Sequence, residues 1–139
     1  MPRSKISPGA RTRHALLHEA TTRPIIGCFY DVYEELKYGL PEPMYATALA
    51  REIAGRGMRV EREAAVDVRY RGSIVGLLRL DLRIDGVVIL ELKAGPVLDP
   101  FAERQLYNYL RWTDCEVGLV LHFGPEPAFK RIVHTKDRR

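Results

Sequence analysis

Cysteine is scarce in this chain, and its scarcity excludes several classes of protein. Of the 139 residues only Cys28 and Cys115 are cysteines, and neither has a second cysteine or a histidine at zinc-site spacing. Two cysteines without a secretory signal are typical of free thiols in a reducing compartment, so we expect a cytoplasmic protein. A disulfide-stapled secreted domain and a zinc finger are therefore excluded as interpretations.

Long apolar runs are lacking as well. No stretch approaches the roughly 20 residues that a membrane helix needs, so we expect no membrane partner. The chain also lacks the glycine-rich loop of nucleotide-binding proteins and any internal repeat. What is present, 46% hydrophobic residues in 139, suffices for the core of one domain.

The charge is weakly positive, with a formal net value of +4. Much of the excess lies near the two ends, and we expect residues 1–13 to form a flexible basic arm before a single domain over residues 14–139. A basic surface favours an anionic partner such as nucleic acid, but solvated tails account for the same excess. Charge alone therefore does not identify a function.

The periodicity of apolar residues predicts the order of the elements. A short helix over 14–20, a longer one from Pro24 to Gly39 with Thr22 as its cap, and a third from about Pro43 to 55 come first. Alternating runs over 60–70, 72–84 and 87–93 predict an antiparallel meander. A helix from Asp99-Pro100 to about Trp112, a buried parallel strand over 116–123 and an edge strand over 129–133 follow. The result is an α/β fold with a mixed sheet flanked by helices.

The clearest strand pattern lies in residues 79–93, which read RLDLRIDGVVILELK. Apolar and polar residues alternate on both sides of Asp85-Gly86, a dipeptide typical of tight hairpin turns. The turn decides which way the charged side chains point, because a shift of one residue moves every side chain of a strand to the other face.

Two registers are open for this hairpin. A two-residue turn places Ile84 opposite Val87 and sets Asp81 and Glu91 on opposite faces. A three-residue turn places Arg83 opposite Val87 and sets the two carboxylates on one face, with Cα atoms roughly 7–8 Å apart. The second register is favoured, because it also gathers the leucine rows of both strands on the other face.

In the favoured register, Asp81, Glu91 and Lys93 form a candidate catalytic centre. Two carboxylates at this spacing can hold one hard cation such as Mg²⁺, with the carbonyl of Leu92 as a further ligand. A bound cation promotes phosphodiester hydrolysis by screening the anionic substrate and lowering the pKa of water, while a lysine stabilises the developing charge. Glu-x-Lys on a strand is usually solvated, but here it lies in apolar strands flanked by helices, where unpaired charge is costly.

Three ordered motifs resemble those of a known family. Gly39-Leu40-Pro41-Glu42-Pro43-Met44-Tyr45 matches the name-giving motif of the GxxExxY proteins, members of the PD-(D/E)xK nuclease superfamily. Asp81 with Glu91-Leu92-Lys93 matches the superfamily's metal motif, although Leu80 replaces its proline. Gln105 and Tyr109 match a Gln-x-x-x-Tyr pattern in the helix that follows. The similarity covers about residues 15–134.

The resemblance implies a restriction-endonuclease-like αβββαβ core and a site that uses Mg²⁺ or Mn²⁺. It implies Glu42 as a supporting metal ligand, where the alternative is a helix-start residue at the N-terminal dipole. It places Gln105 in the catalytic site or at the nucleic-acid backbone. Tyr109 shares its helix face, as a substrate contact or a core residue. Arg79 is a further candidate for binding the substrate.

Three functions follow from these patterns. The first is a Mg²⁺- or Mn²⁺-dependent nuclease, an enzyme that hydrolyses phosphodiester bonds of DNA, in preference to RNA. The second is a catalytically inactive nucleic-acid-binding or regulatory module that retains the nuclease fold. The third is an assembly protein in which Asp81 and Glu91 pair with Arg79 or Arg83 at a dimer contact. A homodimer is compatible with all three.

Overall fold

A computed structural model describes residues 17–136 of the chain. The predicted basic arm lies outside these residues, so the division into an arm and one domain stays a prediction. Three helices and seven strands are described. The helices are α2 (Glu19–Leu36), α3 (Glu42–Gly55) and α4 (Ala102–Arg111). The strands are β1 (Val60–Arg62), β2 (Ala65–Tyr70), β3 (Ser73–Arg79), β4 (Leu82–Ile84), β5 (Val88–Ala94), β6 (Val117–Phe123) and β7 (Pro127–Val133).

Five strands form one mixed sheet in the order β1-β4-β5-β6-β7. β5 and β6 run parallel, and the other neighbours are antiparallel. The parallel pair is reached through α4, the crossover that the apolar run at 116–123 predicted. The restriction-endonuclease-like fold and the predicted edge strand, which is β7, are confirmed.

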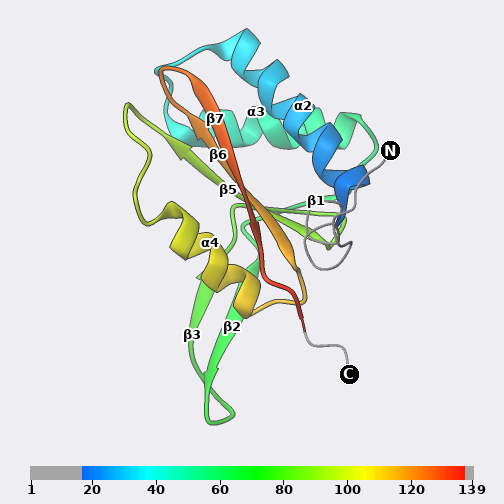
Figure 1. Cartoon of the computed structure of the whole chain (residues 1–139), viewed down its shortest axis with the longest axis vertical. Coiled ribbons are helices and arrows are strands. Elements are labelled where there is room, and N and C mark those ends of the chain that lie inside the picture. The colour runs from blue at the N-terminus through cyan, green and yellow to red at the C-terminus, as the bar shows by residue number, and fades with distance from the viewer. Residues whose placement is uncertain (1–16, 137–139) are drawn as a thin grey trace, which may run out of the picture.

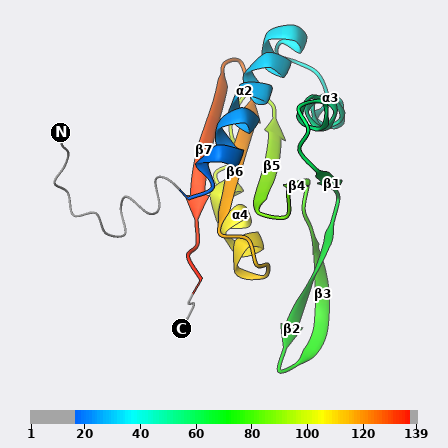
Figure 2. The same ribbon diagram turned by 90° about the vertical axis from the view of Figure 1, so that its right-hand side faces the viewer.

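Helices cover both faces of this sheet (Figures 1 and 2). α2 and α3 pack on one face around Phe29, Tyr45 and Phe123, and α4 packs on the other around Leu106 and Ile89. All seven residues of β6 are buried, which explains why its sequence shows no alternation. None of the helices described is long and apolar enough to cross a membrane.

β2 and β3 form a separate two-stranded sheet, which we call the β2–β3 ribbon. It projects from the body of the molecule (Figures 1 and 2). The ribbon continues the β1–β4 pair across a bend, where Leu80 N donates to Ala64 O at 2.9 Å and Glu63 N donates to Asp81 O at 3.0 Å. The strands of the predicted meander therefore pair as expected. However, the parts of the first two predicted strands that form β2 and β3 lie outside the main sheet.

The predicted hairpin register is wrong by two residues, because Arg83 pairs with Ile89 and not with Val87. Ile84 pairs with Val88, so the connection is Asp85-Gly86-Val87. Ile84 O accepts from Val87 N at 3.0 Å across Asp85 and Gly86, which both have positive φ, and Val87 is then the extra residue. This extra residue preserves the parity of the favoured register, so the predicted faces are correct.

Two helix starts also differ from prediction. α2 begins at Glu19, runs through Pro24 and buries Thr22 within the helix, so Thr22 is not its cap. Pro24 is the sixth residue of this helix, so the hydrogen bond to the carbonyl four residues earlier is missing there. α4 begins only at Ala102, because Asp99 forms a separate turn before it. The side-chain Oδ1 of Asp99 accepts a hydrogen bond from Phe101 N, and its backbone carbonyl accepts one from Ala102 N.

Candidate active site

Asp81 stands where β3 and β4 meet at the bend. Because β4 begins only at Leu82, the backbone of β5 beyond Leu90 has no paired residue on that side. The Asp81 carboxylate takes the missing place: its Oδ2 accepts a hydrogen bond from Leu92 N at 2.8 Å. At the bend, the side chain of Asp81 therefore replaces a backbone group as the hydrogen-bond partner of β5. Burial raises the pKa of Asp81, although the Leu92 N–H opposes the rise.

Glu91 and Lys93 project from β5 toward α4. Glu91 is 3% exposed, and its Oε2 lies 3.2 Å from Lys93 Nζ. Its Oε1 is buried and has no hydrogen-bond partner among the described residues. Burial, together with the charge of Asp81, raises the pKa of Glu91 to about 7. An orphaned carboxylate oxygen in the interior is a costly group that a cation would stabilise.

Lys93 is held by α4 as well as by Glu91. Its Nζ donates to Gln105 Oε1 at 3.0 Å, and Gln105 Nε2 in turn donates to the Tyr109 hydroxyl at 2.8 Å. Asp99 Oδ2 lies 3.9 Å from the same ammonium group. Burial acts to lower the pKa of Lys93, but the surrounding carboxylates outweigh it and leave the pKa raised. Lys93 is therefore a fixed cation at neutral pH.

Glu42 reaches this group from the first turn of α3. Burial, followed by the charge of Asp81, raises the pKa of Glu42, and Lys93 and the Ala94 backbone oppose the rise. The two prolines that flank Glu42 fit the helix start, with Pro41 as the N-cap. Glu42 thus lies close enough to the centre to interact with Asp81 and Lys93.

Tyr45 fixes the loop that carries Glu42. Its hydroxyl donates to Lys37 O at 2.5 Å and accepts from Leu40 N at 3.2 Å, while its ring stacks on Phe123 at 4.2 Å. Gly39 supports the same loop with a φ of +111°, which side chains rarely adopt. The Gly39, Glu42 and Tyr45 pattern therefore has a structural explanation: two residues shape the loop and the third faces the carboxylate centre.

The structure brings most of the predicted residues together and leaves one apart. Asp81, Glu91, Lys93, Gln105 and Tyr109 form one connected group, with Glu42 beside it. Tyr109 is largely buried in the α4 core, as one of its two interpretations held. Arg79 stands on the ribbon, exposed, with its guanidinium 3.4 Å from Glu63. Asp99 joins the group unpredicted, because the sequence marked it only as a helix cap.

Arg83 does not pair with the central carboxylates within the chain. Its guanidinium binds Glu61 on β1 through two hydrogen bonds of 2.8 and 3.1 Å. Together with the Arg79–Glu63 pair, this gives both arginines of the assembly hypothesis a partner other than Asp81 or Glu91.

No group of three or more acidic, histidine or cysteine side chains in residues 17–136 is close enough to hold a metal ion by itself. Asp81 and Glu91 are instead a pair of carboxylates close enough to raise the pKa of Glu91, and the Leu92 backbone N–H binds Asp81. A hard cation that keeps several waters needs only one or two carboxylates, so this donor set fits Mg²⁺ or Mn²⁺. Cys28 and Cys115, by contrast, are buried free thiols away from this centre.

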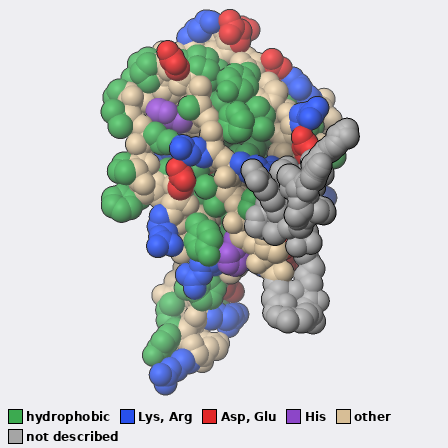
Figure 3. All heavy atoms as spheres, in the orientation of Figure 1, with side chains coloured by type: hydrophobic (Ala, Val, Ile, Leu, Met, Phe, Trp, Pro, Cys, Tyr) green, Lys and Arg blue, Asp and Glu red, His purple; other side chains and the backbone are tan. Residues whose placement is uncertain are grey.

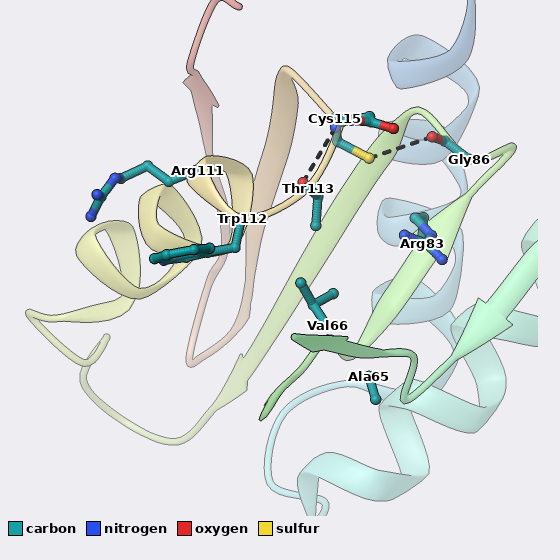
Figure 4. A pocket seen from close by; sticks show the side chains of 9 residues that line it. Ala65, Val66, Arg83, Gly86, Arg111, Trp112, Thr113 and Cys115 are labelled. Atoms are coloured by element: carbon teal, nitrogen blue, oxygen red, sulfur yellow. Dashed lines mark hydrogen bonds between the residues drawn. The ribbon is translucent and has the colours of Figure 1, made fainter. Parts of the chain in front are cut away.

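A separate hollow of about 510 Å³ lies beside the root of the ribbon (Figure 4). Val66, Arg83, Arg111, Trp112 and Cys115 are among the residues that line it, and the Cys115 thiol donates to Gly86 O at 3.4 Å. None of the predicted site residues lines it. The candidate centre is therefore formed by side chains on the sheet and α4, not by this hollow.

Comparison with known proteins gives one match. A family model described as the PD-(D/E)XK nuclease superfamily matches residues 19–132. That range includes every candidate residue from Glu42 to Tyr109. The match is to the superfamily, so membership of the narrower GxxExxY family stays a prediction. No curated protein and no solved structure matches the chain.

Proposed function

Because the chain belongs to the PD-(D/E)XK nuclease superfamily, we propose that it is a nuclease that hydrolyses phosphodiester bonds with the help of Mg²⁺ or Mn²⁺. The superfamily implies a nucleic-acid substrate, and we propose DNA in preference to RNA. The proposal keeps the cytoplasmic location that the cysteine content predicted. Its residues are those of the connected group described above.

The buried Oε1 of Glu91 is the observation that carries this proposal. A buried carboxylate oxygen without a partner costs stability, and side chains that would satisfy it are absent among the residues described. The nearby Asp81 carboxylate increases the local negative charge and raises the pKa of Glu91 further. A divalent cation between the two carboxylates would satisfy both groups at once.

The chain's own residues divide the chemistry between them. Asp81 and Glu91 would hold the cation, and the Leu92 carbonyl would complete the set, because the N–H of that residue already faces Asp81. Glu42 would hold a water of the cation's shell. When bound, the cation would lower the pKa of water and screen the phosphate.

Lys93 would stabilise the negative charge that develops on the phosphate, since it is a fixed ammonium group beside the carboxylate pair. Gln105 would hold that ammonium in place, and Tyr109 would in turn hold Gln105. Gln105 would also contact a substrate phosphate. The exposed Arg79, at the root of the ribbon, would bind the nucleic-acid backbone outside the centre.

Calorimetric titration with Mn²⁺ tests the metal centre without a choice of substrate. The wild type should bind Mn²⁺ at one site, and Asp81→Asn and Glu91→Gln should each weaken that binding at least tenfold. Glu61→Gln is the matched control, because Glu61 is a carboxylate on the same sheet that binds Arg83 instead. Unchanged binding in Asp81→Asn would show that the metal lies elsewhere and would reject the proposed centre.

Cleavage assays then separate the two nucleic-acid hypotheses. Single- and double-stranded DNA and RNA should be incubated with Mn²⁺ and the wild type or Glu91→Gln. Cleavage by the wild type alone supports the nuclease. Salt-dependent binding without metal-dependent cleavage would instead support the inactive binding module.

A further inference from the structure

The β2–β3 ribbon exposes several large apolar side chains to solvent. Tyr70 is 62% exposed, Ile74 52%, Val75 64% and Leu77 62%. In Figure 3 the ribbon at the bottom of the view shows green apolar and blue basic side chains. A two-stranded hairpin alone is marginally stable in water, so surface of this kind indicates a partner.

Both outer edges of the ribbon are open among residues 17–136, but β2 carries Asp67 and Arg69, so the edge of β3 is the one suited to pairing. β3 pairs with β2 on one side, and no strand in residues 17–136 pairs with it on the other. From Ser73 to Leu78 the strand holds neither charge nor proline, the features that natural proteins place on edge strands to prevent pairing. Its N–H and C=O groups are therefore available to another strand.

The sequence of β3 fits a second copy of itself. About an axis at Gly76, antiparallel pairing would place Val75 opposite Leu77 and Ile74 opposite Leu78, so each cross-strand pair is aliphatic. A nucleic-acid backbone would instead need cations along this edge, where Arg79 stands only at its end. The aliphatic edge therefore favours a protein strand over a phosphate backbone as its occupant.

Glycine at the axis leaves room for close approach. A Cβ added to Gly76 would have nothing within 4 Å, so the position is open within one copy. The bulge that leaves Val75 without a partner on β2 increases the local twist. We expect pairing over the few residues around Gly76 and not over the whole strand.

We propose that two copies of this chain form a homodimer in which the β3 edges pair antiparallel around Gly76, joining the two ribbons into one four-stranded sheet. We expect pairing over so few residues to bury less than the roughly 800 Å² per partner of a standard interface, so the dimer should be reversible. This assembly does not depend on the nuclease activity proposed above.

The oligomeric state of the full chain tests the proposal. Sedimentation velocity should show a monomer–dimer equilibrium for the wild type. Protein concentrations from about 1 to 200 µM are suitable, because they cover the range of dissociation constants expected for a weak dimer. Leu77→Lys and Val75→Lys should each weaken the dimer at least tenfold, because each places a charge on the joined edge. Val97→Lys is the matched control, since Val97 is 78% exposed and lies outside the ribbon.

A cross-link tests the pairing itself. Residues opposite each other at the axis of an antiparallel pair have Cα atoms about 4.5–5.5 Å apart, which is within disulfide range. Gly76→Cys should therefore form a covalent dimer under mild oxidation, while Val97→Cys should not.

Two results would overturn the proposal. The first is a wild type that stays monomeric at 200 µM. The second is a dimer that persists in both lysine variants, which would place the contact elsewhere.

Discussion

At the scale of the residue, the burial of the Glu91 carboxylate lowers the stability of the metal-free protein. Its folded-state pKa of about 7 lies above the ordinary value of 4.5, so the folded protein binds the proton more tightly than the unfolded chain does. As the pH rises from 4.5 to about 7, the folded protein loses the stability that the protonated Glu91 contributes. Above pH 7 the metal-free protein carries the full cost of a buried charge.

Glu91→Gln should therefore stabilise the metal-free protein near and above neutral pH. The predicted gain is up to roughly 3 kcal/mol, the equivalent of the pKa difference, and it should shrink toward zero as the pH falls to about 4.5. Urea unfolding of both proteins with a chelator from pH 4.5 to 8 measures this difference. A difference that is constant with pH would contradict the raised pKa.

Lys93 should behave oppositely to the two carboxylates. Lys93→Ala removes the fixed ammonium but none of the proposed ligands, so Mn²⁺ affinity should stay within a few-fold of the wild type. Turnover should fall by about 10²-fold or more, the usual cost of losing a group that stabilises transition-state charge. Calorimetry and single-turnover cleavage measure the two effects separately. Loss of Mn²⁺ binding in this variant would mean that Lys93 maintains the structure of the site and does not act on the substrate.

At the scale of the element, the loop before α3 depends on one hydroxyl. Tyr45→Phe keeps the ring that stacks on Phe123 but removes the bridge between Lys37 O and Leu40 N. We expect a loss of about 1–2 kcal/mol, because the partly buried Leu40 amide loses its acceptor. Urea unfolding checks the loss, and Tyr33→Phe is the control, since its hydroxyl binds Gly124 O and Pro125 O away from this loop. An unchanged stability in Tyr45→Phe would mean that the loop is held by packing alone.

The elements also show what the sequence could predict. Alternation and the Asp-Gly turn predict the hairpin and the shared face of Asp81 and Glu91, because side-chain parity is a local property. The exact register depends on Val87, whose role as an extra loop residue has no local signal. The bend at Asp81 is likewise hidden, since the strand pattern continues unbroken through Leu80.

The residues of the candidate site could likewise be predicted only in part from the sequence. Asp81, Glu91 and Lys93 could be found from charge within apolar strands. Glu42 and Gln105 came only from resemblance, since they reach the centre from other elements. The approach of Asp99 to Lys93 depends on a loop conformation that no periodicity encodes.

At the scale of the whole molecule, the candidate centre lies in the body and the proposed dimer contact lies on the ribbon. The five-stranded sheet with its three helices contains the whole candidate centre, whereas the ribbon contributes only Val66, with Leu78 partly, to the α4 core. The alternation of β2 does not reveal this division, because the same pattern would suit a strand inside the sheet. What distinguishes the ribbon is that, beyond its root beside α4, no helix within residues 17–136 covers it (Figure 2).

Removing the ribbon should therefore separate assembly from metal binding. Joining Ala65 to Arg79 through Asn-Gly retains that cross-strand pair with a turn suited to a two-residue loop. We expect a folded monomer that loses about 2 kcal/mol with the Val66 and Leu78 contacts but binds Mn²⁺ like the wild type. Sedimentation, urea unfolding and calorimetry on one preparation measure the three outcomes. A folded variant that loses Mn²⁺ binding would show that the ribbon holds Asp81 in place, and a variant that still dimerises would locate the interface on the body.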